Sequence, residues 1–212
     1  MIYYSKKYSK KRKITLTAYD ILSFEKEIAE DYNKAKILGP IHLTNGNEKQ
    51  LIEIFSYISK KDYVFSTWRN HSHALLHGVK PKDLKKFIYA GKSMSVSSKK
   101  PFFFASSIVT GILPIALGTA LGLKKKKSKN KVWCFVGDMT AETGIFHEVH
   151  KYSTRHKLPM YFVIEDNNMS TNTPTPKVWG GIKTDFKKLD NVIYYTYKNL
   201  YPHHGTGKWV LF

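Results

Sequence analysis

Polar residues follow two apolar runs of the sequence, at the points where buried strands are expected to end. Asp138 comes two residues after the run 132–136, and "EDNN" at 165–168 directly follows the run 160–164. With a helix between them, the two runs form the strand–helix–strand unit that makes parallel strands. Because the carboxyl ends of parallel strands meet at one edge of a sheet, we expect Asp138 and Asn167 to lie close together.

These residue types suit a divalent cation. Carboxylate and amide oxygens are the ligands that Mg²⁺ prefers, and the ion often keeps a substrate phosphate in its shell. Gly137 lets the backbone approach a diphosphate, and a helix starting a few residues later would direct its first amides to the same place. A helix-capping Asp and a turn-forming Asn pair would explain either site alone. Their occurrence after consecutive parallel strands favours the cation site.

Hydrophobic periodicity predicts the elements that must position these side chains. Thr17 and Asp20 resemble a capping box at the start of the first helix, which Gly39 and Pro40 end. A loop with Trp68, Arg69 and His71 is expected after the first strand, and another over residues 91–100. The expected helices are 17–38, 47–59, 81–89, one following Pro114, and 144–156, and the expected strands are 63–66, 132–136, 160–164, 192–197 and 209–211.

The alternation of helices with buried strands predicts an α/β fold with a mostly parallel central sheet flanked by helices. We expect a basic N-terminal tail over residues 1–16 and one domain over residues 17–212. In the helix after Pro114, every second residue from 116 to 122 is Ala or Gly. Such small side chains would let another element approach the helix closely.

Thirty-five Lys and Arg against 16 Asp and Glu give a formal net charge of +19, which raises the question of nucleic-acid binding. Much of the excess lies in residues 6–13 and 124–131, which we interpret as a solvated tail and a solvated loop. Without a helix-turn-helix, zinc-finger or RNA-recognition signature, nucleic acid is not the favoured partner. An acidic partner would explain the same charge.

The sequence favours a cytoplasmic protein without a membrane segment. No apolar stretch reaches the roughly 18 to 20 uncharged residues of a membrane helix. The basic N-terminus lacks the apolar region of a secretory signal. Cys134, the only cysteine, falls in an expected strand, where a thiol behaves as a small hydrophobe.

Two histidine groups raise the question of zinc. "HEVH" at 147–150 does not have the spacing of the H-E-x-x-H motif. His73 and His77 are four residues apart without a third ligand nearby, so we interpret them as a polar surface pair. The sequence therefore does not favour a zinc site.

Several motifs together resemble one enzyme family. "GDMTAETG" followed by "EDNN" resembles the motif that binds thiamine diphosphate with magnesium. "HLTNGNEKQ", "DYVFSTWRNHSHALLHGVKPKDL", "AGKSM" and "SIVTGILPIALGTALGLK" occur in the order and spacing typical of the alpha subunit of the first, decarboxylating component of 2-oxo acid dehydrogenase complexes. The likeness covers residues 17–170.

The resemblance implies a cofactor, a reaction and a set of site residues. Asp138, the side chain of Asn167 and the backbone carbonyl of Met169 would hold Mg²⁺, and His42 and His71 match catalytic histidines near the reacting carbon. The implied reaction is decarboxylation of a 2-oxo acid with transfer of the acyl or aldehyde unit. The implied contacts with thiamine diphosphate are Trp68 and Arg69 at the diphosphate, Ser107, Ile108 and Val109 at the aminopyrimidine ring, and Gly137, Asp138, Met139, Thr140 and Asn167 at the cation motif.

The resemblance also implies a partner. In this family a separate beta subunit supplies the glutamate that activates the pyrimidine, and nothing in this sequence resembles its pyrimidine-binding domain. We therefore expect a beta-type partner, in an assembly of two alpha and two beta chains.

The sequence departs from the family in three places. Met139 stands where glycine is usual, and a bulky side chain there could alter cofactor affinity. The region after "EDNN" is short and lacks the family's long helix and its loop with a phosphate-facing histidine; we expect His203 and His204 in a surface turn. "HEV", "MSTNTPTPKVWGG" and "YPHHGTGKWV" resemble split transketolase-like enzymes. Ketol transfer between sugar phosphates, or cofactor binding without catalysis, therefore stay open as alternatives.

Overall fold

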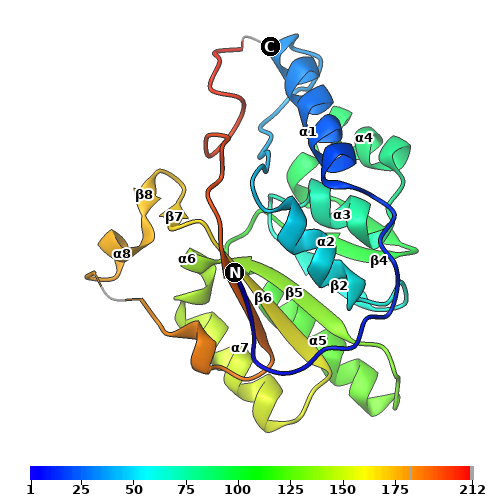
Figure 1. Cartoon of the computed structure of the whole chain (residues 1–212), viewed down its shortest axis with the longest axis vertical. Coiled ribbons are helices and arrows are strands. Elements are labelled where there is room, and N and C mark those ends of the chain that lie inside the picture. The colour runs from blue at the N-terminus through cyan, green and yellow to red at the C-terminus, as the bar shows by residue number, and fades with distance from the viewer. Residues whose placement is uncertain (182, 211–212) are drawn as a thin grey trace.

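One sheet forms the centre of the computed structural model, which describes residues 1–181 and 183–210 (Figure 1). Five neighbouring strands are parallel, and the strand at each edge is antiparallel. In order across the sheet, the strands are β1 (Ile2–Tyr4), β9 (Val192–Thr196), β6 (Met160–Asp166), β5 (Val132–Gly137), β2 (Tyr63–Ser66), β4 (Phe102–Ala105) and β3 (Ser97–Lys99). The predicted α/β fold with a mostly parallel sheet is confirmed.

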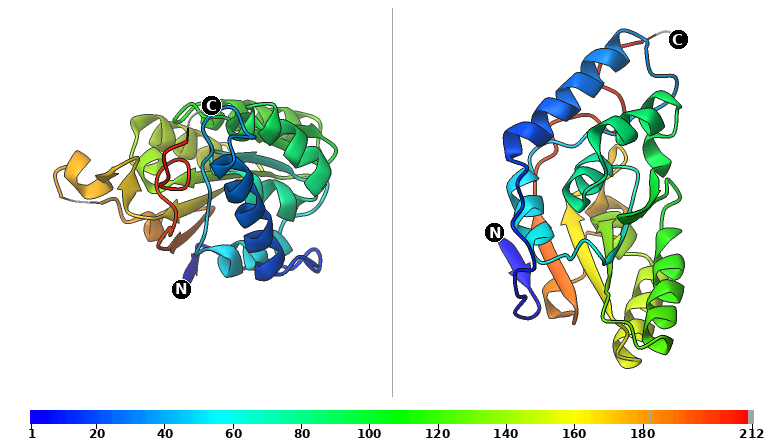
Figure 2. Two further views of the ribbon diagram at one scale, coloured as in Figure 1. Left: turned by 90° about the horizontal axis from the view of Figure 1, so that it is seen from above. Right: turned by 90° about the vertical axis from the view of Figure 1, so that its right-hand side faces the viewer.

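Helices cover both faces of the sheet (Figure 2). One face carries α1 (Ala18–Asn33), α2 (Glu48–Ser56), α3 (His71–His77), α4 (Pro81–Tyr89) and the 3₁₀ turn η1 (Ser93–Ser95), and the other carries α5 (Ile112–Lys125) and α7 (Gly144–Arg155). The remaining elements are short: α6 (Asp138–Ala141), the hairpin β7 (Met169–Ser170) and β8 (Thr173–Pro174), α8 (Thr175–Val178) and η2 (Phe186–Lys188).

Strand β5 shows why the central strands read as continuous apolar runs. Successive side chains of a strand point to opposite faces. Trp133 and Phe135 pack under the layer of α1 to α4, whereas Val132, Cys134 and Val136 pack under α5 and α7. Since helices cover both faces, every position of the strand from Val132 to Val136 is buried.

The helix starts follow local capping chemistry. Thr17 and Asp20 form the predicted capping box of α1, with the Thr17 side chain accepting from the Asp20 amide and the Asp20 carboxylate accepting from the Thr17 amide. The helix ends at Asn33, several residues before the predicted stop at Gly39. Helix α5 begins at Ile112, so Pro114 lies within its first turn, where no intrahelical N–H is required.

The N-terminus differs from the expected solvated tail over residues 1–16. Strand β1 pairs with β9 and forms one edge of the sheet. The Arg12 side chain donates to the carbonyls of Ile58 and Leu76, at 2.8 and 2.6 Å. A basic composition therefore did not prevent packing, because backbone pairing and buried carbonyls supply partners that a local pattern does not reveal.

Three other segments also differ from the sequence prediction. The loop expected over residues 91–100 contains η1 and strand β3, and β4 follows it. The loop expected to carry His71 ends at Asn70, because α3 begins at His71. Residues 209 and 210 of the strand expected at 209–211 are not in a strand, and Leu211 lies outside the described residues.

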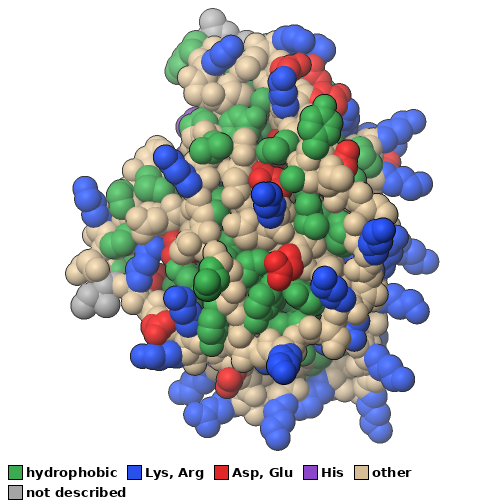
Figure 3. Space-filling view, in the orientation of Figure 1, with side chains coloured by type: hydrophobic (Ala, Val, Ile, Leu, Met, Phe, Trp, Pro, Cys, Tyr) green, Lys and Arg blue, Asp and Glu red, His purple; other side chains and the backbone are tan. Residues whose placement is uncertain are grey.

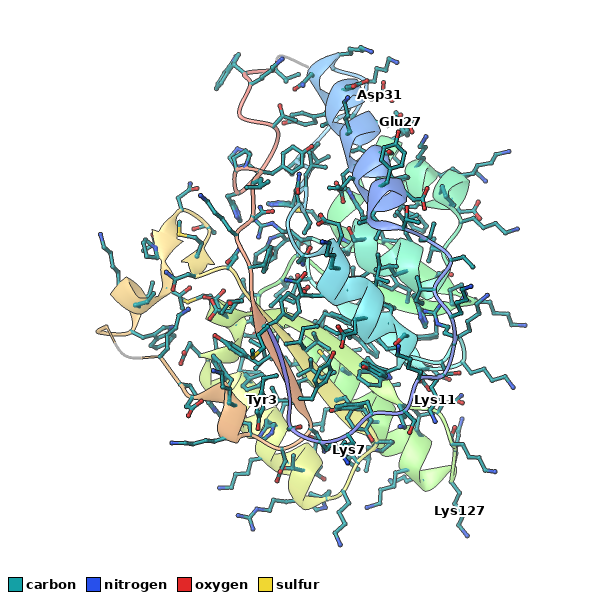
Figure 4. All side chains as sticks on the ribbon, in the orientation of Figure 1. Tyr3, Lys7, Lys11, Glu27, Asp31 and Lys127 are labelled. Carbon is teal, nitrogen blue, oxygen red and sulfur yellow. The ribbon has the colours of Figure 1, made fainter. Side chains whose placement is uncertain are left out.

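The lysine blocks differ in their surroundings. Lys124–Lys127 lie at the end of α5, and Lys127 points away from the molecule (Figure 4). Lys and Arg side chains line much of the lower and right-hand margin of the visible face (Figure 3). The lysines of both blocks are mostly exposed, as expected, but Lys124 and Lys125 belong to α5 rather than to a loop, and Arg12 of the first block is partly buried. Among the described residues, no helix is both long and apolar enough to cross a membrane.

Candidate functional site

A cavity of about 70 Å³ lies beyond the carboxyl ends of the parallel strands. Residues of α6 and of β7 contribute to its lining, and β7 begins the arm formed by β7, β8 and α8 (Figure 1). Its lining combines residues that follow β2, β4, β5, β6 and β9: Thr67, Trp68, Arg69, Val109, Gly137, Asp138, Met139, Thr140, Glu165, Asn167, Met169, Ser170, Thr171 and Tyr197. Nine of the residues expected at a cofactor or metal site are therefore brought together.

Asp138 is the central acidic group of this cavity. Strand register places Gly137 beside Glu165, so Asp138 and Asp166 follow at the same level. Asp138 is 1% exposed, and neither carboxylate oxygen has a hydrogen-bond partner among the described residues. Burial raises the pKa of Asp138 to about 6, the Asp166 charge adds to the rise, and Thr175 and Lys183 oppose it. Lys183 Nζ forms an ion pair with Asp138 Oδ2 at 3.4 Å, and a buried carboxylate without hydrogen bonds is what a cation ligand would leave behind.

Asp166 has the opposite environment, although it is equally buried. Its carboxylate accepts from Lys183 Nζ at 2.8 and 3.0 Å, from Tyr194 at 2.6 Å and from the amide of Asn168 at 2.8 Å. Burial alone would raise its pKa, but the hydrogen bonds from Lys183 and Tyr194 outweigh burial and lower it. Sequence reasoning missed both Asp166 and Lys183 as site residues. Asp166 could have been found as the second carboxylate of "EDNN", whereas nothing in the sequence marks Lys183.

Asn167 and Met169 lie together in the turn after β6. Asn167 Oδ1 accepts from the amide of Met169 at 3.1 Å. An amide oxygen has two lone pairs, so this contact leaves one for a cation. Asn168 between them has φ +61°, a left-handed conformation that Asn tolerates better than most residues.

The Met139 side chain contacts the arm formed by β7, β8 and α8. Its sulfur accepts from Trp179 Nε1 at 3.3 Å. A Cβ added at Gly137 would meet nothing within 4 Å. The open space in front of the strand end is thus kept by Gly137.

Trp68, Arg69 and His203 form a cluster of hydrogen-bond donors. Trp68 Nε1, Arg69 Nε and His203 Nδ1 are buried and have no hydrogen-bond partner among the described residues. Buried donors without partners are uncommon, and an anion would satisfy them. His203 and His204 lie in a bend, and His204 is exposed as expected, whereas the ring of His203 is partly buried against His42 and Trp68.

His42 is 7% exposed and donates through Nδ1 to the carbonyl of His203 at 2.7 Å. Burial lowers the pKa of His42 to about 4, and the neighbouring His203 and Arg69 charges add to the effect. His42 contacts Trp68 at a ring-centroid distance of 5.9 Å but does not line the cavity itself.

The structure separates His71 from the cavity. It is 1% exposed, and its ring nitrogens face Glu25 and the Ser93 hydroxyl, the latter at 2.8 Å. The surface pair expected of His73 and His77 is wrong, since both side chains are buried. Among the described residues, no group of three or more His, Cys, Asp or Glu side chains could hold a metal ion.

His73 connects the cavity lining to the core. Its Nε2 lies 3.2 Å from Glu165 Oε1, and its Nδ1 lies 2.7 Å from the Ser66 hydroxyl. The same Glu165 oxygen accepts from the Asn47 amide at 3.2 Å and from the Tyr195 hydroxyl. This network fixes Glu165 as a wall of the cavity.

Residues 107–109 form an exposed loop at the rim of the site. Ile108 is 70% exposed and Val109 is 45% exposed, and Val109 also lines the cavity, whereas Ser107 and Ile108 do not. The apolar side chains of Ile108 and Val109 are therefore accessible to a ligand or a partner chain.

The cavity can be compared with the groups that the sequence implies. A cavity of about 70 Å³ is much smaller than the roughly 300 Å³ or more of a site that encloses a drug-sized ligand, so it would enclose only part of an organic cofactor. The unused oxygens of Asp138 and the unpaired donors of Trp68 and Arg69 fit a cation beside an anion. The residues present thus fit a metal–diphosphate pair.

Comparisons with known proteins found sequence relatives of most of this chain. Residues 17–181 match the family described as the dehydrogenase E1 component. The alpha subunit of the pyruvate dehydrogenase E1 component from Porphyra purpurea is 31% identical over 177 residues, covering 74% of this chain and 52% of that protein. Subunit alpha of acetoin:2,6-dichlorophenolindophenol oxidoreductase from Bacillus subtilis (strain 168) is 30% identical over 165 residues, covering 73% and 50%.

The coverage of these relatives is partial. The chain spans about half the length of the two curated relatives named above. An X-ray structure of a proposed thiamin diphosphate-dependent enzyme from Mycobacterium smegmatis aligns with a TM-score of 0.42 and 18% identity, over 64% of this chain and 23% of that one. This distant likeness carries no weight in the assignment, which rests on the sequence matches. The chain therefore belongs to the dehydrogenase E1 component family, and that membership implies thiamine diphosphate as its cofactor.

Proposed function

We propose that this chain is the alpha-type subunit of a two-subunit enzyme, dependent on thiamine diphosphate and Mg²⁺, that decarboxylates a 2-oxo acid and transfers the acyl or aldehyde unit. One observation carries the proposal: the buried Asp138 carboxylate, with no hydrogen bond among the described residues, lines the same cavity as Trp68 and Arg69. Family membership supports it.

Each residue has a role that follows from its surroundings. Asp138, Asn167 Oδ1 and the Met169 carbonyl would hold Mg²⁺, because hard cations prefer oxygen ligands. The guanidinium of Arg69 and the indole N–H of Trp68 would bind diphosphate oxygens. When bound, the cofactor supplies a nucleophilic carbon and an electron sink for decarboxylation.

The two predicted histidines receive different roles. His42, neutral near pH 7 because burial lowers its pKa to about 4, lies against Trp68 and would face the substrate. His71 is enclosed between Glu25 and Ser93, so it would act as a positioning residue rather than by touching the substrate.

A beta-type partner would complete the site on the side of the exposed loop. Ile108, Val109 and Ile115 are 70%, 45% and 49% exposed. At Gly118 and Gly122 of α5 an added Cβ would meet nothing within 4 Å, so this small-residue face is open to close approach. Partner contacts would therefore cover apolar side chains and present Ser107, Ile108 and Val109 to the aminopyrimidine ring. Assembly as two alpha and two beta chains, and a cytoplasmic location, belong to the same proposal.

Calorimetry of the chain, co-expressed with its partner, tests the cofactor site. Thiamine diphosphate with Mg²⁺ should bind, and Asp138→Ala should abolish binding. Asp83→Ala, which changes a half-exposed carboxylate on α4, should leave it unchanged. No binding, or binding unaffected by Asp138→Ala, would refute the assignment. Consumption of sugar phosphates but not of 2-oxo acids would instead favour ketol transfer.

A further inference from the structure

Lys183 lies beside an acidic pair, Asp138 and Asp166, of which Asp138 is the proposed Mg²⁺ ligand. Lys183 Nζ lies 2.8 and 3.0 Å from the two oxygens of Asp166 and 3.4 Å from Asp138 Oδ2. The Asp138 and Asp166 side chains are 1% and 4% exposed, and the Lys183 side chain is 24% exposed. The ammonium thus reaches from the edge of the site to two buried carboxylates.

The segment around Lys183 is attached to α6 on both sides. Before it, Trp179 donates to the Met139 sulfur at 3.3 Å. After it, the amide and hydroxyl of Thr184 donate to the Glu142 carboxylate, at 2.9 and 2.7 Å. These contacts direct the lysine towards the end of β5, so its place beside Asp138 does not depend on one flexible side chain alone.

The two ion pairs differ in strength. Two buried carboxylates close together repel each other unless a cation compensates them. The contact with Asp166 has hydrogen-bond distances and is supported by Tyr194. The contact with Asp138 is longer, and no hydrogen bond accompanies it. Asp138 can therefore exchange the ammonium for another cation while Lys183 stays bound to Asp166.

We infer that Lys183 is a tethered counter-ion that competes with the divalent cation for Asp138. Without metal it neutralises the acidic pair and keeps the strand ends together. With metal it shifts to Asp166 alone, and its charge weakens cation binding. Lys183 thereby sets the metal concentration at which the site fills. This inference rests on the proposed cation site and adds a determinant of its affinity.

Titration with Mn²⁺, followed by electron paramagnetic resonance, tests this on the full chain with its partner and without thiamine diphosphate. Lys183→Met should raise Mn²⁺ affinity about tenfold, as expected when one nearby positive charge is removed. It should also lower the melting temperature in chelator by about 2–4 °C, because the acidic pair loses its counter-ion. Lys187→Met removes an exposed lysine of the same segment and should match the wild type in both measurements.

The outcomes separate this inference from the proposed function. If the wild type and Lys183→Met bind Mn²⁺ equally, with binding lost in Asp138→Asn, the cation site stands and the inference is wrong. If neither protein binds Mn²⁺, or Asp138→Asn binds as the wild type does, both are wrong. An equal gain in Lys187→Met would show a general charge effect and overturn the inference. Lys183→Gln, which keeps a polar group, serves where the Met variant does not fold.

Discussion

Asp138→Asn is expected to stabilise the chain in the absence of metal and to remove cation binding. Burial raises the pKa of Asp138 from 3.8 to about 6, so the ionised carboxylate is unfavourable in the folded state at neutral pH. Since a tenfold change in proton affinity is about 1.4 kcal/mol, this cost is about 3 kcal/mol. An amide of the same shape avoids it but leaves its own polar atoms without partners, so we expect a gain of about 1–2 kcal/mol.

The sign of this effect can be checked through pH. The raised pKa means that the folded wild type binds a proton more readily than the unfolded chain between about pH 4 and pH 6. The wild type therefore loses stability relative to Asp138→Asn as pH rises through this window, whereas below about pH 4 only the cost of the unpaired amide remains and the variant becomes the less stable protein by about 1–2 kcal/mol.

Urea unfolding in chelator at pH 7.5 measures the difference, with Asp83→Asn as a control on a half-exposed carboxylate. Addition of Mg²⁺ and thiamine diphosphate should then stabilise the wild type but not the variant. A variant less stable than the wild type by more than about 1 kcal/mol in chelator would refute the view that Asp138 is a strained ligand.

Three further changes test other parts of the structure. Asp62→Ala should lower the free energy of unfolding, measured in urea, by about 3 kcal/mol. The reason is that the buried Trp133 Nε1 and the backbone amides of Ser59 and Lys131 lose their acceptor. Asp62→Asn should lower the free energy of unfolding by less. Burial lowers the pKa of His77 to about 4, so the unfolded chain binds a proton at this residue at higher pH than the folded chain. Stability therefore falls as pH is lowered from about 6.5 to about 4. His77→Gln should reduce this pH dependence of the melting temperature, measured across the same range. Gly137→Val should keep the fold but block the cavity, so calorimetry should show lost binding of Mg²⁺ and thiamine diphosphate with an unchanged melting temperature; a large fall in melting temperature would contradict the open space at Gly137.

The strands and the polar residues at their ends could be predicted because both depend on neighbours in the chain. The apolar runs at 132–136 and 160–164 are buried on both faces except at the partly buried Tyr161, which leaves a pattern without charged interruptions. The parallel pairing of β5 and β6 follows from the helix between them, and it brings Asp138 and Asn167 to one cavity as expected.

The same reasoning failed where the decisive contact joins distant segments. The basic N-terminus was expected in solvent, yet β1 completes the sheet against β9, and His73 was expected at the surface, yet it lies between Ser66 and Glu165. Composition and spacing report a residue's own preference, whereas these residues are ordered by partners that only the folded chain brings near.

The sequence by itself determined the fold class, the family and most of the residues around the cavity. Only the tertiary structure decided the electrostatic state of the site. The Asp166 carboxylate accepts several hydrogen bonds, the Asp138 carboxylate accepts none among the described residues, and the Lys183 ammonium lies beside both. Asp138 and Asp166 differ because Lys183 and Tyr194 reach Asp166 from separate segments, and such hydrogen-bond distances depend on how the chain returns to the strand ends. No local sequence pattern predicts the path by which the segment with Lys183 reaches the ends of the strands.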